Sequence, residues 1–153
     1  MGQLDGPMVL VTATAVDGEH DGCLVGFSTQ AAIDPPRYLV LLSKTNHTFD
    51  VAQRAEYLGV HFPTPAQRDL AERLGTQTGD EVDKLGAEAW HPGPQGVPIL
   101  DEVARWFVGH ILERFDAGDH VAFLLDPVDG AARDGLEQLG FQAVKDLDPG
   151  HDP

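Results

Sequence analysis

Residues 23–49 read CLVGFSTQAAIDPPRYLVLLSKTNHTF, a pair of strand patterns around an Asp34-Pro35-Pro36 triplet. We predict one strand over 23–33 and another over 37–43. The prolines should form the corner between them, because proline cannot donate to a ladder hydrogen bond. The second strand is nearly all apolar, so we expect it to be buried on both faces. The segment therefore predicts two strands joined by a tight corner.

A polar run follows the second strand and ends where a helical pattern begins, over 47–56. It contains Ser43, Lys44, Asn46 and Thr48. Hydroxyl donors, one lysine and the free N–H groups of a helix start are good partners for a phosphate. The run therefore predicts a site for an anionic ligand.

The overall charge narrows the class of partner. The 153 residues carry 10 basic and 25 acidic side chains, a formal charge of −15. This balance disfavours nucleic acids and anionic membranes, which need a basic surface. No apolar run is long enough for a transmembrane helix, and no signal-peptide pattern opens the chain. With a single cysteine, Cys23, the simplest interpretation is a cytoplasmic protein with one domain over 1–153.

The rest of the chain is rich in strand patterns. Further strands are predicted over 8–16, 58–62, 104–114 and 120–127, with a weak one over 141–144. Thr64, Pro65 and Gln67 predict a capping box and a helix that ends at Gly75. Residues 75–100 predict a long surface excursion with a short polar helical piece near 80–85, and 146–153 a loose tail. Together these elements favour a mainly β fold, a small barrel with helices over its open parts.

Two details of this pattern are specific enough to test. Alternation over 104–114 puts Trp106, Val108, His110 and Leu112 on one face of their strand. The segment 17–22 is polar and predicts a turn between the first two strands.

Several common kinds of site are not supported. The seven histidines show no HxxxH, HxH or HExxH spacing, so we expect no metal site. No phosphate-binding P-loop, dinucleotide GxGxxG turn or GxSxG nucleophile elbow occurs. Cys23 lies in an apolar strand pattern, which favours a core residue over a nucleophile.

The segment GCLVGFSTQAAIDPPRYLVLLSKTNHTF resembles the flavin reductase-like proteins of the FMN-binding split-barrel group. Further matches follow in the same order, at Asp83-Lys84-Leu85, Gly96-Val97-Pro98-Ile99-Leu100 and Ala117-Gly118-Asp119-His120. The resemblance implies a six-stranded antiparallel split β-barrel of Greek-key type, usually a homodimer with flavin near the subunit interface. It also implies hydride transfer from NADH or NADPH to FMN or FAD.

Site residues follow from the same resemblance. Phe27, Ser28, Thr29 and Gln30 would line the ribityl and phosphate side, and the backbone of Ala32, Ile33 and Asp34 would meet the isoalloxazine edge. Ser43, Lys44, Asn46 and Thr48 would contact the phosphate. His120, the candidate catalytic residue, would lie near the nicotinamide and the ring face. Each residue also has a plainer interpretation, as an outward strand residue, a solvated charge or a turn histidine.

The chain departs from the family pattern at several positions. Fewer hydroxyls precede the Asp-Pro-Pro corner, His61 stands where asparagine is common, and the residues after 126 differ. We expect an NAD(P)H-dependent flavin reductase that supplies a partner monooxygenase. Three alternatives stay open: a non-catalytic FMN-binding or electron-transfer protein, a flavin oxidoreductase of a small organic substrate, and a β-barrel interaction module without cofactor. FMN against FAD, NADH against NADPH, and whether flavin stays bound are also open.

Overall fold

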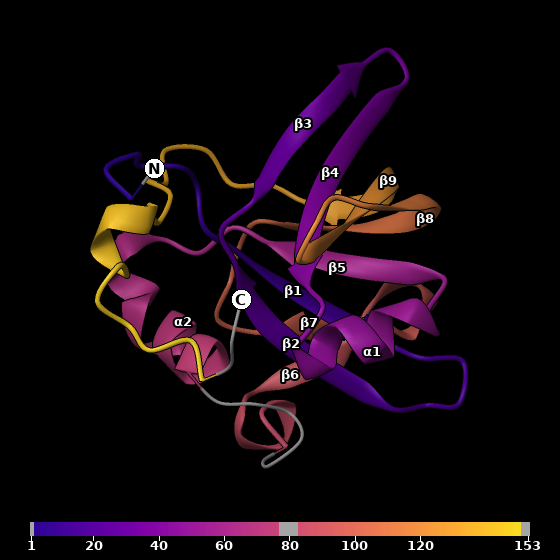
Figure 1. The fold of residues 1–153 in the computed structure, drawn as a ribbon, viewed down its shortest axis with the longest axis horizontal. Helices are drawn as coiled ribbons and strands as arrows, with labels where there is room; N and C mark the ends of the chain where they lie inside the picture. The colour runs from indigo at the N-terminus through magenta and orange to yellow at the C-terminus, as the bar shows by residue number, and fades with distance from the viewer. Residues whose placement is uncertain (1, 77–82, 151–153) are drawn as a thin grey trace.

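The computed structural model describes residues 2–76 and 83–150 (Figure 1). Its main sheet is antiparallel, with seven strands in the order β2-β1-β5-β8-β9-β4-β3. These strands are β1 (Val9–Thr14), β2 (His20–Val25), β3 (Ser28–Ile33), β4 (Pro36–Ser43), β5 (Tyr57–His61), β8 (Trp106–Asp116) and β9 (His120–Ala131). The expected mainly β fold is confirmed, but the main sheet has seven strands where six were expected.

The other elements are short. A second antiparallel pair joins β6 (Trp90–Pro92) and β7 (Pro98–Leu100). The helices are α1 (His47–Gln53) and α2 (Arg68–Thr76), with single 3-10 turns η1 (Pro65–Gln67), η2 (Leu85–Ala87), η3 (Pro94–Gly96) and η4 (Phe141–Ala143). Among residues 2–76 and 83–150, no helix is long and apolar enough to cross a membrane.

Strand β1 is buried on both faces, which explains why its pattern is continuous rather than alternating. Val11 faces the main core with Val60 and Phe123, and α1 covers this core through Val51. Leu10 packs on the other side, in a cluster that α2 closes with Leu70 and Leu74. The two helices therefore cover opposite faces of the first strand.

Strands β3 and β4 form an arm that projects from the body of the molecule (Figure 1). Asp34 and Pro35 turn the chain at its tip, and Pro36 already pairs with Ile33. Ile33 is 84% exposed there. The predicted corner is confirmed.

The single strand predicted over 23–33 is wrong, because the chain changes neighbours within it. Residues up to Val25 pair with β1, whereas Ser28 onward pairs with β4, and Gly26 and Phe27 make the change. The turn predicted over 17–22 is also too long, since β2 begins at His20.

The face predicted for β8 is confirmed for Trp106, Val108 and His110, and the alternation breaks only at Leu112. Val108 packs with Trp106 and Tyr57, and the ring of His110 contacts that of Tyr57. Phe107 and Ile111 face the main core on the other side of the strand. The register with β9 shifts at Leu112, which is the extra residue of a bulge in β8, whereas the shift between Val108 and Gly109 leaves Val128 of β9 as the extra residue.

From Thr64 onward the structure agrees with some of the predicted elements and differs from others. The capping box at Thr64 is confirmed, although the helix passes Gly75 to Thr76. The excursion over 75–100 contains β6 and β7, and 141–144 holds a 3-10 turn instead of a strand. Arg68 pairs with Asp146 at the start of the predicted tail, and the looseness of 146–153 stays a prediction. Residues 80–82 and 151–153 lie outside the described residues.

Candidate functional site

A cavity of about 650 Å³ opens beside the ends of β2 and β4. Its walls are mainly apolar, with few polar side chains. The lining residues are Gly2, Leu4, Gly6, Met8, Cys23, Leu24, Val25, Gly26, Phe27, Leu41, Leu42, Ser43, Asn46, His120, Phe141 and Pro149. Apolar walls with a few polar groups are the usual composition of a site for a small organic ligand.

Four residues that the sequence singled out line this cavity, namely Phe27, Ser43, Asn46 and His120. They come together because β4 and β9 pair in a register that places Ser43 opposite His120. The pairing continues past the strand ends, where the N–H of Lys44 donates to the carbonyl of Asp119 at 3.0 Å. The predicted polar run and the predicted Gly-Asp-His turn therefore meet at one edge of the cavity.

The rings of Phe27 and His120 contact each other at the mouth of the cavity. Their centroids are 5.0 Å apart and their planes are tilted by 56°. Nδ1 of His120 lies 2.7 Å from a carboxylate oxygen of Asp119, which orients the imidazole. Phe27 is 58% exposed, so its ring stands where a planar ligand can reach it.

The polar edge of the cavity is built by the turn before α1. Oγ of Ser43 lies 3.1 Å from Oγ1 of Thr45, and Oδ1 of Asn46 accepts from the N–H of Thr48 at 3.0 Å. Asn46 is thus the N-cap of α1. Ser43 and Asn46 supply the hydrogen-bonding groups on this side.

The arm residues divide between two faces. The register of β3 and β4 puts Thr29 on the face of Phe27 and Leu41, next to the cavity but outside its lining residues. Ser28 is turned to the opposite face, where its hydroxyl lies 3.0 Å from that of Tyr38. Farther along the arm, beyond the residues that line the cavity, lie Gln30, Ala32, Ile33 and Asp34.

Two predicted phosphate ligands are held by other partners. Nζ of Lys44 lies 2.6 Å from Asp116, and this hydrogen bond holds the pKa of the Asp116 carboxyl below its usual value. The hydroxyl of Thr48 is buried and donates to Oδ2 of Asp21 at 2.9 Å. The structure does not bring the Thr48 side chain to the cavity.

The sequence did not indicate the wall made by the two ends of the described chain. The N–H of Met8 donates to the carbonyl of Leu139, and the N–H of Phe141 donates to the carbonyl of Gly6. These contacts bring Leu4, Met8 and Phe141 to the cavity. The signal available was weak, because only the departure from the family pattern after residue 126 marked this region as unusual.

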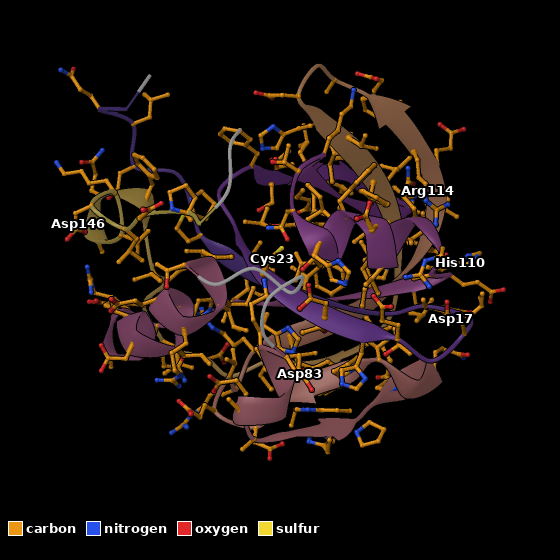
Figure 2. All side chains as sticks on the ribbon, turned by 60° about the horizontal axis from the view of Figure 1, so that its bottom comes forward. Asp17, Cys23, Asp83, His110, Arg114 and Asp146 are labelled. Carbon is orange, nitrogen blue, oxygen red and sulfur yellow. The ribbon has the colours of Figure 1, made fainter. Side chains whose placement is uncertain are left out.

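Cys23 also lines the cavity, near the centre of the molecule (Figure 2). Its side chain is 1% exposed, and burial raises the pKa of its thiol to about 11. The thiol therefore stays protonated and serves as a packing group. Across residues 2–76 and 83–150, no group of three or more His, Cys, Asp and Glu side chains is placed to hold a metal ion.

Comparison with known proteins gives a consistent result. The model of the family described as "Flavin reductase like domain" matches residues 1–145. The reductase subunit of stachydrine N-demethylase from Rhizobium meliloti is 28% identical over 134 residues, 88% of this chain and 56% of that protein. The NADH:riboflavin 5'-phosphate oxidoreductase of Streptomyces pristinaespiralis is 27% identical over 129 residues, 84% of this chain and 72% of that protein.

A solved structure shares the fold. The FMN-binding protein from Thermus thermophilus with bound p-hydroxybenzaldehyde superposes with a TM-score of 0.80 at 29% identity, covering 86% of this chain and 74% of that one. The chain spans 56% and 42% of the lengths of two Rhizobium meliloti relatives, about half of each.

Proposed function

Because this chain belongs to the flavin reductase like domain family, we propose that it binds FMN and catalyses reduction of the flavin by a reduced nicotinamide nucleotide. The observation that carries the proposal is the cavity in which Phe27 and His120 stand beside Ser43 and Asn46. It offers apolar and aromatic surface to a ring system and hydrogen-bonding groups to a phosphorylated chain.

The residues present fit a flavin nucleotide. Ser43 and Asn46 would hold the phosphate end, with Lys44 joining them if it leaves Asp116. Thr29 and the backbone of 32–34 would follow the cofactor along the arm. Phe27 and the apolar wall of Leu41, Met8 and Phe141 would exclude water from the ring.

The chemistry needs little from the protein. A bound flavin accepts hydride itself, so the chain must supply binding, orientation and a dry site. His120 stands at the cavity mouth with its Nδ1 held by Asp119, where it can orient the nicotinamide. This assigns His120 a role in positioning the two rings.

The partners form part of the proposal. Relatives include reductase subunits of an N-demethylase and of a flavin-dependent monooxygenase, so we propose that this chain also supplies reduced flavin to an oxygenase. The exposed Ile33 on the arm supports the homodimer that the resemblance implies. A cytoplasmic location stays a prediction from the sequence.

A second candidate is a flavin oxidoreductase that acts on a small organic substrate. The apolar wall supports it, because it leaves room for an apolar ligand beside the ring-binding surface. The Thermus protein was solved with p-hydroxybenzaldehyde and with a cyclohexenone bound.

The test is the visible spectrum of the protein reconstituted with FMN, before and after anaerobic addition of NADH. We expect the oxidised-flavin bands to bleach within seconds. A bound flavin that neither NADH nor NADPH bleaches would contradict the reductase and favour the second candidate or a non-catalytic role. No spectral change on adding FMN or FAD would overturn flavin binding altogether.

A further inference from the structure

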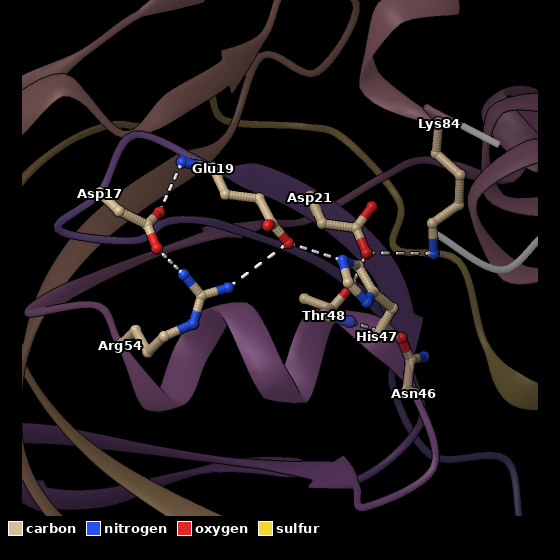
Figure 3. Close-up of polar contacts among 8 residues, drawn as sticks. All are labelled: Asp17, Glu19, Asp21, Asn46, His47, Thr48, Arg54 and Lys84. Carbon is tan, nitrogen blue, oxygen red and sulfur yellow. Dashed lines mark hydrogen bonds and ion pairs between the residues drawn. The ribbon is translucent and has the colours of Figure 1, made fainter. Parts of the chain in front are cut away.

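A buried ion pair lies behind the polar edge of the cavity. Nζ of Lys84 is 3.9 Å from Oδ2 of Asp21, and the two side chains are 1% and 3% exposed. The same Asp21 oxygen accepts from the hydroxyl of Thr48 at 2.9 Å (Figure 3). Lys84 also contacts the carbonyl of Leu74, at 3.5 Å. The pair thus links β2, α1 and the end of α2.

The pair connects to the cavity through one further hydrogen bond. The N–H of Thr48 donates to Oδ1 of Asn46, which lines the cavity, whereas Asp21, Thr48 and Lys84 do not (Figure 3). Asp21 therefore contacts Thr48, and Thr48 contacts the pocket residue Asn46.

The surrounding contacts act on the same helix. Asp17 and Glu19 pair with Arg54, and Glu19 also pairs with His47 (Figure 3). These outer pairs are partly exposed, so each contributes little to the stability of the fold. Asp21 differs because it is buried, and a buried carboxylate persists only when it is paired and hydrogen-bonded.

Stability alone does not explain such a pair. Apolar side chains of similar volume often replace a buried ion pair without loss of stability, so the pair is weak support for a stabilising role. What apolar side chains cannot supply is a directed acceptor for the Thr48 hydroxyl, which sets the position of the turn over 43–48.

We propose that Asp21 and Lys84 are positioning residues for cofactor binding: through Thr48 they hold Asn46 and Ser43 where these receive the phosphate of the flavin nucleotide. This inference rests on the proposed function. The pair acts on the phosphate end of the ligand and not on the ring.

The test compares dissociation constants for FMN and riboflavin, which differ only in the phosphate, by quenching of flavin fluorescence. Asp21→Leu/Lys84→Met removes the pair, and Thr48→Val removes the hydroxyl that it holds. Each should lower the preference for FMN over riboflavin by about tenfold, the size expected for one charge-assisted hydrogen bond. Riboflavin affinity should change by less than about twofold.

Thr12→Val is the matched control. Thr12 is equally buried, and its hydroxyl donates to the carbonyl of Pro98 at 2.7 Å, away from α1. It should lose stability as Thr48→Val does but keep the preference for FMN. A merely structural role of Thr48 would give both variants the same preference as the wild type.

The triple variant separates indirect from direct action. If Thr48 acts through the pair, then adding Thr48→Val to Asp21→Leu/Lys84→Met lowers the preference for FMN over riboflavin no further. Losses that multiply would mean that Thr48 touches the ligand itself, which overturns the inference. If the double variant does not fold, the comparison of Thr48→Val with Thr12→Val decides. A lower preference for FMN over riboflavin in Thr48→Val alone supports the inference, and an unchanged preference in Thr48→Val overturns it.

The proposed function can fail separately. A wild-type chain that binds neither flavin overturns both proposals. A wild-type chain that prefers FMN, with the preference intact in Asp21→Leu/Lys84→Met, overturns only the positioning role.

Discussion

The ring of Phe27 lies 5.0 Å from the imidazole of His120, although the two residues belong to distant parts of the chain. Phe27 precedes β3, whereas His120 begins β9, and both strands pair with β4. The mouth of the cavity therefore depends on the position of β4 between its two neighbours.

Replacing His120 tests its place at this mouth. We expect His120→Asn to lower kcat/KM for NADH in flavin reduction by about tenfold, because the two rings lose a positioning contact, while FMN affinity changes little. His91→Asn is the matched control, since His91 also pairs through Nδ1 with an aspartate, Asp101, but outside the cavity. If His120→Asn and His91→Asn have the same kcat/KM for NADH at saturating FMN, His120 does not take part in the reaction.

The ion pair of Lys44 and Asp116 predicts a gain of function. Asp116→Asn frees the ammonium for phosphate, so FMN should bind a few-fold more tightly at low salt, whereas Lys44→Met should weaken binding. Titrations at two salt concentrations would measure this, with Asp126→Asn as control because Asp126 pairs with Arg37 instead. If neither Lys44→Met nor Asp116→Asn changes FMN affinity at low salt, Lys44 is only a surface charge.

His61 predicts a loss of stability in acid. It is fully buried, with Nδ1 donating to the carbonyl of Leu10 and Nε2 accepting from the N–H of Leu100, and burial lowers its pKa to about 4. The unfolded chain, with a histidine pKa near 6.5, binds a proton that the folded chain does not. The contribution of His61 to the free energy of unfolding is therefore fully present above about pH 6.5. It is lost as the pH falls toward 4, and the total loss is about 3 kcal/mol.

The variant His61→Asn isolates this effect. Asparagine also offers one donor and one acceptor, but it does not titrate. Urea unfolding between pH 4.5 and 7.5 should give a flatter stability curve for the variant. Parallel curves would show that His61 is not the group responsible.

Cys23 should resist labelling despite lining the cavity. With its pKa near 11, about one thiol in a thousand is ionised at pH 8, and only the thiolate reacts. We expect iodoacetamide to modify the folded chain far more slowly than the chain in urea, as measured by mass spectrometry. Because Cys23 is the only cysteine, the mass change reports on it alone. Similar rates in the two conditions would disprove its burial.

Some site residues followed directly from local sequence. The run after β4 and the Gly-Asp-His turn were recognisable because their chemistry lies in consecutive residues. Ser28 and Thr48 are different, since their hydroxyls face Tyr38 and Asp21. Sequence could not indicate those partners, because a hydroxyl binds whichever acceptor the fold brings near it.

The fold likewise has features that local sequence predicts and features that depend on distant parts of the chain. The Asp-Pro-Pro corner and the Thr64 capping box were predictable, because proline geometry and capping hydrogen bonds act within a few residues. The division of 23–33 into β2 and β3, and the bulges in the pair of β8 and β9, were not, because they depend on which strand lies alongside. Strand pairing is a long-range choice that local patterns do not encode.

The sequence by itself thus determined the mainly β character, the family resemblance and the polar segment 43–48, since each is written in neighbouring residues. Only the tertiary structure decided that Ser43 lies opposite His120, that the two ends of the described chain form a cavity wall, and that Lys84 is buried against Asp21. The reason is physical: burial, ion pairing and strand register depend on groups that meet only once the chain has folded.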